Sequence, residues 1–576
     1  MSHQSEATLE NNLIKQLKGL GYAVAKIPDG EALVNNLKSQ LEAFNQTNFS
    51  QKEFEVILNH LAKGTVFEKA KTLRDRLNLT KEDGTSFYVR FYDSEDWNQN
   101  LFQVTNQITQ EGSYKNRYDV TLLVNGLPLV QIELKRRGLE IKEAFNQINR
   151  YQRHTFWSNY GLFQYVQIFV ISNGGNTKYL ANNKLQSVKQ TFFWANVDNK
   201  NLTELPDFAE AFLNPDHLGK MIAKYIVTNE THKIMMVLRP YQYYASEAII
   251  QQVSNSTDNG YIWHTTGSGK TLTSFKTSQI LMELPSVHKV VFVVDRKDLD
   301  YQTMKEFNAF KKDSVDVTKN TSSLVRQLAD DTKLVLTTIQ KLNNAISDRY
   351  QSTIQHLKDK RLVFIFDECH RSQFGETHER ITQFFSKSQL FGFTGTPIFA
   401  DNATKNELGK RTTKDLFGNC LHKYVITDAI HDQNVLRFGI EYVGKYKNKS
   451  NLSIDIEVEA IDKTEAFNDP RRLEKIVDYI IAHHHQKTFS KDYSALFAVS
   501  SITNLIQYYD IFQQKKLAGE HDLRIATIFT YGANEEDEDA QDLLPDDAPS
   551  QAAELKVAYQ SSHTRDKLDA YISDYN

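Results

Sequence analysis

Short apolar runs typical of β-strands alternate with helical patterns from about residue 228 onward. The runs are "GYIW" (260–263), "VVFVVD" (290–295), "LVLTT" (334–338), "LVFIF" (362–366) and "LFGF" (390–393). Strands that are apolar throughout and are separated by helices are typical of a parallel sheet with both faces covered. The sequence therefore predicts an α/β fold for this part of the chain.

A second set of such runs starts near Phe438 and includes "ALFAVSS" (495–501) and "LRIATIF" (523–529). Residues 1–227 differ, because they mix helical patterns with a hairpin signal. A chain of 576 residues is too long for one hydrophobic core. We therefore expect three domains, over residues 1–227, 228–432 and 433–576.

The composition is that of a globular protein outside the secretory pathway, with 40% hydrophobic and 24% charged residues. No apolar run reaches the ~18 residues of a membrane span, and the N-terminus lacks the features of a signal peptide. The only cysteines, Cys369 and Cys420, exclude a disulfide framework and a cysteine-based zinc site. A net charge of −4 means that any nucleic-acid surface must be local. We expect a cytoplasmic protein with no membrane partner.

A glycine-rich stretch, "HTTGSGKT" (264–271), follows a predicted strand and precedes a helical pattern, as a phosphate-binding P-loop does. Its glycines let the backbone curl so that N–H groups face phosphate oxygens. Lys270 would reach the β- and γ-phosphates of ATP, and Thr271 would ligate Mg²⁺. The general pattern has glycine where this chain has His264. The candidate ATP-binding residues of the loop are Thr266, Gly267, Ser268, Gly269, Lys270 and Thr271.

An acidic pair ends a later apolar strand, in "FIFDECH" (364–370). Asp367 can hold Mg²⁺, and Glu368 can bind ATP and polarise the attacking water. The next strand ends in "FTGTP" (393–397). These motifs, in this order behind a P-loop, resemble superfamily-two helicases and translocases. The resemblance implies two RecA-like domains with ATP between them, whose opening and closing moves the protein along duplex DNA.

Further motifs extend this resemblance, which an adenylate kinase or a GTPase would not share. In "RPYQ" (239–242), the resemblance implies that Gln242 reads adenine. It assigns the coupling between ATP and DNA to Thr394, Gly395 and Thr396. The stretches "VVDRKDLDYQT" (293–303) and "TTIQKL" (337–342) also match. The DNA-contact candidates in these two stretches are Arg296, Lys297, Thr337 and Thr338.

Three charges interrupt the strongly β-forming stretch "YDVTLLVNGLPLVQIELKRRG" (118–138), which contains an Asn-Gly hairpin signal. A strict two-residue turn would set Asp119 opposite the apolar Ile132, on the wrong face. A three-residue turn or a bulge would set it opposite Glu133 instead. Pro128 favours a non-ideal turn, so we predict the second register.

In that register Asp119, Glu133 and Lys135 share one face of the hairpin. The two carboxylates and the carbonyl of Leu134 offer the hard oxygen ligands that Mg²⁺ prefers. The metal would activate water at a scissile phosphate, and Lys135 would orient the nucleophile or neutralise the transition state. This is the Asp…Glu-x-Lys pattern of the PD-(D/E)xK nucleases. An exposed strand face with an Asp–Lys pair would explain the same residues without a function.

The next helical stretch, "EAFNQINRYQRH" (143–154), favours the nuclease interpretation. Gln147 and Tyr151 are four residues apart, so they share a helix face. Gln-x-x-x-Tyr directly after Glu-x-Lys resembles the RecB-like branch of the nuclease family, and adds both residues to the catalytic candidates. The neighbouring basic residues, which fit phosphates but could equally be solvated charge, are Arg136, Arg137, Arg150 and Arg153.

A PD-(D/E)xK nuclease that precedes a superfamily-two motor in one chain resembles the R (restriction and motor) subunit of type I restriction enzymes. The resemblance implies ATP and Mg²⁺ as cofactors. It also implies duplex DNA and the methylation (M) and specificity (S) subunits as partners. The S subunit would recognise the DNA site and the R subunit would pump flanking DNA. Cleavage of unmodified DNA would follow away from the site.

The chain departs from the family pattern near its end. After "ALFAVSS" the family continues through strands with a Gly-x-x-x-x-Gly-Asp-type turn and a Gln-Arg motif, neither of which occurs here before Asn576. We therefore expect an incomplete second RecA-like domain and a chain that is a fragment. Two rival hypotheses are a stand-alone repair helicase-nuclease and a catalytically silent fragment that binds ATP and DNA.

Overall fold

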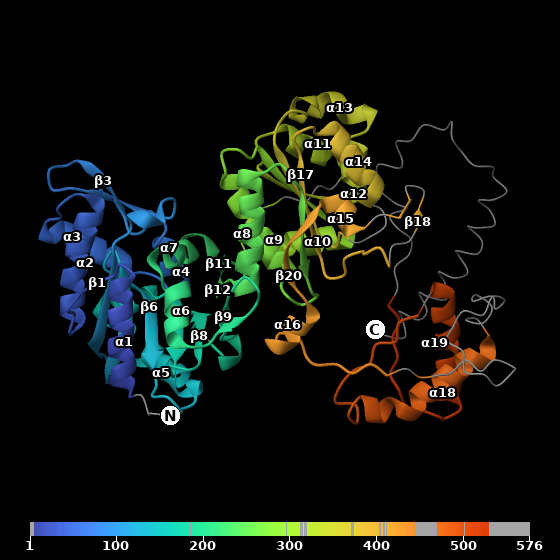
Figure 1. The fold of residues 1–576 in the computed structure, drawn as a ribbon, viewed down its shortest axis with the longest axis horizontal. Coiled ribbons are helices and arrows are strands. Elements are labelled where there is room, and N and C mark those ends of the chain that lie inside the picture. Colours follow the sequence, from blue (N-terminus) through green and yellow to red (C-terminus); the bar gives the residue numbers. More distant parts are fainter. Residues whose placement is uncertain are drawn as a thin grey trace. The chain divides into compact units, whose positions relative to one another are not determined.

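The computed structural model describes residues 5–184, 186–294, 297–310, 315, 320–369, 374–401, 405–406, 409–410, 412–441, 443, 469–499 and 501–528. Contacts divide the chain into two compact units, Met1–Arg437 and Phe438–Asn576. The first unit contains both six-stranded sheets, which include β6 and β17 in Figure 1. The division into three domains stays a prediction.

The N-terminal part of the first unit is a mixed sheet with strand order β1-β4-β5-β6-β7-β8. Its strands are β1 (Ala23–Val24), β4 (Phe102–Glu111), β5 (Lys115–Val124), β6 (Leu127–Leu134), β7 (Ile168–Ser172) and β8 (Thr177–Ala181). The helices are α1 (Glu6–Gly19), α2 (Gly30–Asn45), α3 (Gln51–Ala62), α4 (Val66–Thr72), α5 (Ile141–His154), α6 (Leu205–Phe212) and α7 (Pro215–Lys220). Three hairpins accompany them: β2 (Arg76–Thr80) with β3 (Ser86–Arg90), β9 (Trp194–Ala195) with β10 (Asn201–Leu202), and β11 (Ile226–Asn229) with β12 (Ile234–Val237).

Strand β6 lies in the middle of this sheet and is buried along its whole length. On one face of the sheet, α1 buries Leu9, Leu13 and Leu17, whose four-residue spacing forms one apolar stripe. Full burial of β6 takes Gln131 and Glu133 out of water together with its apolar residues. Because a buried polar group costs free energy unless it has a partner, these two side chains need a specific environment.

A two-residue turn followed by a bulge joins β5 to β6. The turn residues Asn125 and Gly126 have positive φ values of 51° and 83°, which match the twist of paired strands. The register shifts between Leu122, which pairs with Val130, and Leu123, which pairs with Pro128, so that Leu129 is the extra residue. Proline has no N–H to give to a strand ladder, which makes its neighbourhood a natural place for a bulge.

The bulge decides which residues of the hairpin face each other. Beyond it Val120 pairs with Ile132, so the next residues, Asp119 and Glu133, lie opposite each other. This confirms the predicted register, and a bulge rather than a three-residue turn produces it.

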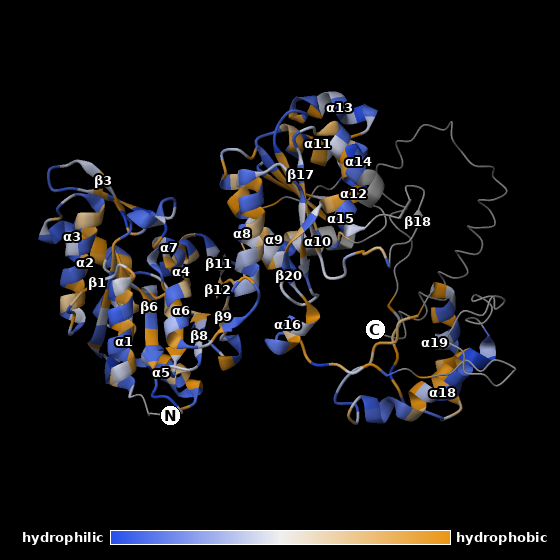
Figure 2. Cartoon of the chain, in the orientation of Figure 1, coloured by the Kyte–Doolittle hydropathy of each residue, from blue (hydrophilic) through white to orange (hydrophobic). Residues whose placement is uncertain are grey.

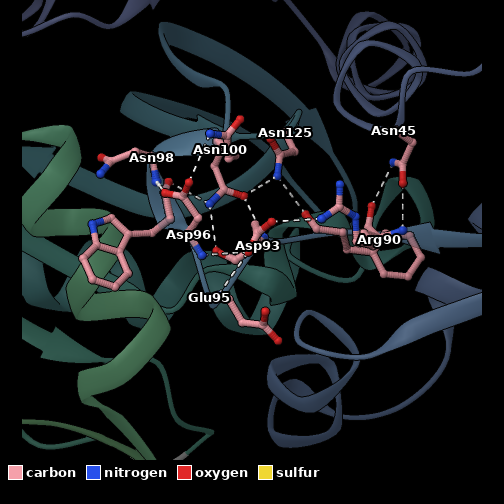
Figure 3. A network of polar contacts seen from close by, with 11 residues as sticks. Asn45, Arg90, Asp93, Glu95, Asp96, Asn98, Asn100 and Asn125 are labelled. Atoms are coloured by element: carbon pink, nitrogen blue, oxygen red, sulfur yellow. Dashed lines mark hydrogen bonds and ion pairs between the residues drawn. The ribbon is translucent and has the colours of Figure 1, made fainter. Parts of the chain in front are cut away.

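A network of polar contacts holds the turn of this hairpin (Figure 3). Asn125 is fully buried; its Oδ1 accepts the N–H of Leu101 at 2.8 Å and its Nδ2 donates to Asn100 Oδ1 at 2.7 Å. Asn100 Oδ1 also accepts the N–H of Asp93 at 2.9 Å, and Asp93 contacts the Arg90 guanidinium at 2.9 Å. The turn is therefore anchored in the core rather than left as a surface loop.

The second sheet of the first unit has the order β15-β14-β16-β17-β13-β20, and every pairing in it is parallel. The strands are β13 (Gly260–His264), β14 (Lys289–Val294), β15 (Leu334–Thr338), β16 (Leu362–Phe366), β17 (Gln389–Thr394) and β20 (Asn419–Tyr424). The helices are α8 (Pro240–Asn255), α9 (Lys270–Glu283), α10 (Lys297–Phe310), α11 (Thr321–Ala329), α12 (Ile339–Ala345), α13 (Asp348–Ile354), α14 (Phe374–Phe384), α15 (Thr413–Phe417) and α16 (Ile426–His431). A short hairpin joins β18 (Lys405–Asn406) to β19 (Gly409–Lys410).

The apolar runs predicted as strands β13 to β17 are all confirmed, within one residue at each end. Two separate cores explain why these runs are apolar throughout. On β14, Val291 and Val293 join one hydrophobic cluster while Val290 and Phe292 join another. A strand that is covered on both faces has no side chain left for water. In Figure 2, α2 and α8 combine hydrophobic and hydrophilic residues, as helices on the outside of a sheet do.

The second unit lacks, in its described residues, the two strands that the sequence predicted there. Its described residues form two helices, α18 (Pro470–Lys487) and α19 (Ile502–Leu517), which pack around Val477 and Phe512. The predicted strands at 495–501 and 523–529 are not formed over 495–499, 501 and 523–528, the parts of them that are described. Both runs line a pocket of about 660 Å³ instead. A strand needs a neighbouring backbone to complete its ladder, and apolar sequence alone does not supply one.

The acidic segment at 534–550 lies outside the described residues. In the part of the chain that is described, no helix combines the length and the apolar character needed to cross a bilayer.

Candidate functional site

The bulged hairpin brings two carboxyl groups together at the end of β6. Glu133 is fully buried, and its Oε1 accepts the Gln131 Nε2–H at 2.9 Å. The backbone N–H of Leu134 donates to Asp119 Oδ2 at 2.8 Å. The N–H of Leu134 therefore fixes the aspartate beside the strand that carries the glutamate.

Both carboxyl groups hold protons more tightly than usual. Burial raises the pKa of Glu133 well above its ordinary value, and the charge of Asp119 adds to the rise. Burial also raises the pKa of Asp119, with further increases from the charges of Glu10 and Glu6. Acids that are buried side by side ionise readily only when a cation joins them. The electrostatics of this pair therefore favour a bound cation.

Lys135 lies next to this pair but makes its contacts elsewhere. Its Nζ donates to the carbonyl oxygen of Leu134 at 2.9 Å and lies 3.8 Å from Glu6 Oε1 on α1. The Leu134 carbonyl, expected as a metal ligand, thus accepts a hydrogen bond from the lysine. The ammonium still lowers the pKa of both Asp119 and Glu133 by its charge.

Helix α5 brings the Gln-x-x-x-Tyr pair to the same place. The Tyr151 hydroxyl donates to the carbonyl oxygen of Arg117 at 2.8 Å and lies 3.4 Å from Glu133 Oε2. Gln147 Nε2 donates to the Tyr151 hydroxyl. These two residues, chosen from their spacing and from the resemblance to RecB-like nucleases, therefore form one chain of contacts that ends at Glu133.

Two acids on α1 complete the surroundings of the site, and sequence reasoning missed both. Glu10 is buried and accepts hydrogen bonds from the amides of Asn106 and Gln107 on β4. Glu6 faces Lys135. The sequence did contain a signal for a site here: Glu6 and Glu10 are four residues apart, and carboxylates at that spacing repel each other on an isolated helix.

The donor set fits a hard divalent cation that keeps much of its water. Among the described residues, no group of three or more His, Cys, Asp or Glu side chains is arranged to hold a metal ion by itself. Asp119 and Glu133 offer carboxylate oxygens from two paired strands. Mg²⁺ is commonly held by one or two carboxylates with water and phosphate oxygens in the other positions. Buried Glu133 and half-buried Asp119, both with a raised pKa, meet that description.

The basic residues after β6 are only partly available. The Arg136 backbone N–H donates to Glu6 Oε1 at 3.3 Å. Arg137 pairs with Glu204 at 2.9 Å, and both side chains are about half exposed. Their role as DNA contacts stays a prediction.

The second candidate site lies between β13 and α9. Gly267 and Gly269 have positive φ values of 81° and 79°, the backbone form that glycine adopts without strain. The loop therefore curls directly into the N-terminus of α9, which begins at Lys270. A helix N-terminus presents unpaired N–H groups and a positive dipole end, which suits a phosphate. Thr266 is exposed and Thr271 half-buried at this end.

The acidic pair after β16 faces the P-loop lysine. Lys270 Nζ lies 3.2 Å from Glu368 Oε1. Burial, with the charge of Glu368, raises the pKa of Asp367 to about 6. The structure thus brings together the lysine and the two acids that spacing assigned to ATP and its metal.

The motif after β17 touches the P-loop backbone. A Cβ added to Gly395 would lie 3.3 Å from the backbone nitrogen of Thr266. The Thr394 hydroxyl accepts the N–H of Thr396 at 3.1 Å, which shapes the turn. A larger residue in place of Gly395 would therefore press on the phosphate-binding loop.

Gln242 reaches the same loop from α8. Its Nε2 donates to the carbonyl oxygen of Ser268 at 3.3 Å and its Oε1 accepts the N–H of Arg239 at 3.0 Å. The Tyr241 hydroxyl also donates to the Ser268 carbonyl, at 2.8 Å. The adenine role of Gln242 stays a prediction, because in this structure its amide contacts the P-loop backbone.

The histidine at the first position of the loop pattern is a core residue. His264 is fully buried, and its Nε2 lies 3.0 Å from His422 Nδ1 on β20. Burial lowers the pKa of His422 to about 4 and that of His264 well below its ordinary value. Both rings are therefore neutral at pH 7, and the pair joins two neighbouring strands below the loop.

The four remaining candidates are the residues predicted to contact DNA. Thr337 and Thr338 are buried at the end of β15, where the Thr338 hydroxyl caps α12 by accepting the N–H of Lys341. Arg296 lies outside the described residues, and for Lys297 the structure describes the backbone alone. Direct DNA contact by these four residues stays a prediction.

Comparison with known proteins adds family matches over three stretches. Residues 3–187 match the type I restriction enzyme R protein N terminus, residues 241–472 the SWI2/SNF2 ATPase, and residues 491–576 domain 3 of the type I restriction enzyme subunit R. The type I restriction enzyme SauCOLORF180P endonuclease subunit of Staphylococcus aureus (strain COL) is 46% identical over 100% of this chain and 60% of its own length. The chain therefore spans 60% of the length of this relative.

The type I restriction enzyme EcoprrI endonuclease subunit of Escherichia coli is 38% identical over 44% of this chain and 84% of its own length. Among solved structures, a nuclease-deletion mutant of the type ISP restriction-modification enzyme LlaGI in complex with a DNA substrate mimic is 17% identical. That match covers 49% of this chain and 30% of the other, with a TM-score of 0.28.

Proposed function

Because the chain belongs to the family of type I restriction enzyme endonuclease subunits, we propose that it acts as the restriction (R) subunit of such an enzyme. In this role it moves duplex DNA with energy from ATP and cuts unmodified DNA away from the recognised sequence. The assignment of each step to particular residues follows from the two sites of the first unit.

Cutting is assigned to the hairpin of β5 and β6. The observation that carries it is the bulge, which sets half-buried Asp119 opposite buried Glu133, where both pKa values are raised. Mg²⁺ bound there would stabilise the charge that grows on a scissile phosphate. Asp119 and Glu133 hold the ion, and Glu10 adds negative charge beside Asp119. The Tyr151 hydroxyl orients the Glu133 carboxylate.

Lys135 supplies the positive charge of this site. Its Nζ lies within reach of the Leu134 carbonyl and of Glu6, so a short rotation of a flexible side chain takes it toward a phosphate. There it neutralises charge on the phosphate or orients the attacking water.

ATP binding is assigned to the loop between β13 and α9. Lys270 would exchange its contact with Glu368 for the phosphates, and Thr271 and Asp367 would hold the Mg²⁺ that accompanies the nucleotide. Once Lys270 binds the phosphates, Glu368 would accept a proton from the attacking water. Thr394, Gly395 and Thr396 lie against the loop and transmit its state toward the DNA.

Production of the gene product with M and S subunits tests this proposal. We expect the three to co-purify and to cut unmodified DNA only when both ATP and Mg²⁺ are present. Cutting by this protein alone, without ATP and without either partner, would contradict the assignment and favour a stand-alone nuclease.

A further inference from the structure

Gln107 lies in the middle of β4 with a left-handed backbone, at a φ of 58°. Residues with a Cβ rarely adopt this form, because the Cβ crowds the following carbonyl. Asn106 pairs with Val120 and Ile108 pairs with Tyr118, so Gln107 lies opposite Asp119. All residues of β4 are described, and Gln107 is the one that does not pair with β5.

The left-handed backbone changes the direction of the Gln107 side chain. In a regular strand, neighbours such as Asn106 and Gln107 point to opposite faces of the sheet. Here both amides reach one carboxylate on α1. Asn106 Nδ2 donates to Glu10 Oε1 at 2.5 Å, and Gln107 Nε2 donates to Glu10 Oε2 at 2.5 Å. Two consecutive residues thus hold both oxygens of one acid, which we call the amide clamp.

Docking of α1 on the sheet does not require this arrangement. Leu9, Leu13 and Leu17 already attach the helix by an apolar stripe, and a buried acid with a strained partner weakens such an interface. The strain also leaves a polar atom unsatisfied, since Gln107 Oε1 is buried without a hydrogen-bond partner among the described residues. Strained backbone of this kind is typical of functional sites.

The position of Glu10 indicates the function of the amide clamp. The charge of Glu10 raises the pKa of Asp119, so the two carboxyl groups are close enough for their charges to interact. Gln107 itself lies across the ladder from Asp119. The clamp therefore holds an extra acid, and an unsatisfied carbonyl oxygen, at the aspartate side of the proposed nuclease site.

We propose that Asn106 and Gln107 are positioning residues, whose clamp on Glu10 tunes the affinity of the nuclease site for its divalent cation. The inference rests on the proposed function of that site. The clamp fixes Glu10 in advance, so that a cation held by Asp119 and Glu133 is also attracted by a nearby negative charge that is already in position.

Titration calorimetry with Mn²⁺ and no nucleotide tests the clamp on the full chain. The variants are Gln107→Gly, Asn106→Ala, Glu10→Gln, Glu133→Ala and the double variant of Gln107→Gly with Glu10→Gln. Glycine adopts the left-handed form without strain, so Gln107→Gly removes the amide and keeps the backbone. Asn106→Ala removes the other half of the clamp from a regular strand position. A thermal melt of each variant checks that it is folded.

We expect Gln107→Gly and Asn106→Ala each to weaken Mn²⁺ binding about tenfold, as loss of a partner behind a metal ligand does. The double variant should bind no more weakly than Glu10→Gln alone, because the clamp acts through Glu10. Unchanged binding by both clamp variants, or fully additive losses in the double variant, would overturn the clamp while Glu133→Ala still abolishes binding. If Glu133→Ala binds Mn²⁺ like the unaltered chain, the proposed nuclease site itself is wrong.

Discussion

Lys270 and Glu368 form an ion pair at 3.2 Å across the candidate ATP site. One partner opens α9 and the other follows β16, so the contact joins the phosphate-binding loop to the acid that would activate water. In the proposed function, a nucleotide phosphate would compete with Glu368 for the lysine. Binding of ATP would then coincide with release of the acid.

Replacement of Lys270 by alanine should abolish ATP turnover. The ammonium is the positive charge that would meet the transferred phosphate, and loss of such a group costs on the order of 100-fold or more in rate. A phosphate-release assay with DNA present measures it. Lys414→Ala, an exposed lysine of α15, is the matched control and should turn over ATP normally. Normal turnover by the Lys270 variant would remove this loop from ATP chemistry.

Replacement of Asp367 by asparagine should raise the melting temperature of the nucleotide-free chain at pH 7.5. Burial and Glu368 raise the pKa of Asp367 from 3.8 to about 6, so its charge destabilises the fold above pH 6 and has no effect below about pH 4. The expected gain is about 3 kcal/mol at pH 7.5. Calorimetric melts at pH 7.5 and pH 4 should show the gain only at the higher value. A gain of equal size at both values would disagree with this pKa.

Two replacements of Asn125, by glycine and by alanine, should destabilise the first unit by different amounts. Asn125→Gly keeps the left-handed turn but leaves the Leu101 N–H and Asn100 Oδ1 without this partner, at a cost of about 2–3 kcal/mol. Asn125→Ala should cost about 1 kcal/mol more, because alanine resists a φ of 51°. Urea unfolding measures both. Equal stability of Asn125→Gly and the unaltered chain would mean that the network does not hold the hairpin.

Replacement of Tyr151 by phenylalanine should slow DNA cutting and leave ATP turnover unchanged. The lost hydroxyl lies 3.4 Å from Glu133 and is held by the Arg117 carbonyl. Loss of a group that orients a metal ligand typically costs 10–100-fold. Tyr160→Phe, in an exposed turn, serves as the control. A parallel fall in ATP turnover would show general damage instead of a local role.

Much of this fold follows from the sequence because the patterns are local. The apolar runs of β13 to β17 require two buried faces, and the structure has two cores. The alternation around Glu133, together with Pro128, was enough to predict the register of the hairpin.

Other features depend on parts of the chain that meet only in the folded protein. The left-handed backbone of Gln107 has no local signal, since glutamine is an ordinary strand residue. Its side chain contacts Glu10, which lies far away in sequence on α1. Burial of Thr337 and Thr338 likewise depends on how α12 packs after β15. The strands expected over 495–501 and 523–529 were wrong over their described residues because a strand needs a neighbour that its own sequence does not supply.

The most direct test replaces Glu133 by glutamine in the chain assembled with its M and S subunits. Cutting of unmodified DNA and ATP turnover are then measured in the same preparation. Glu143→Gln, on an exposed part of α5, is the control. We predict that Glu133→Gln stops cutting, keeps ATP turnover at the level of the unaltered chain, and loses Mn²⁺ binding. Undiminished cutting by this variant would contradict the nuclease site at the bulged hairpin.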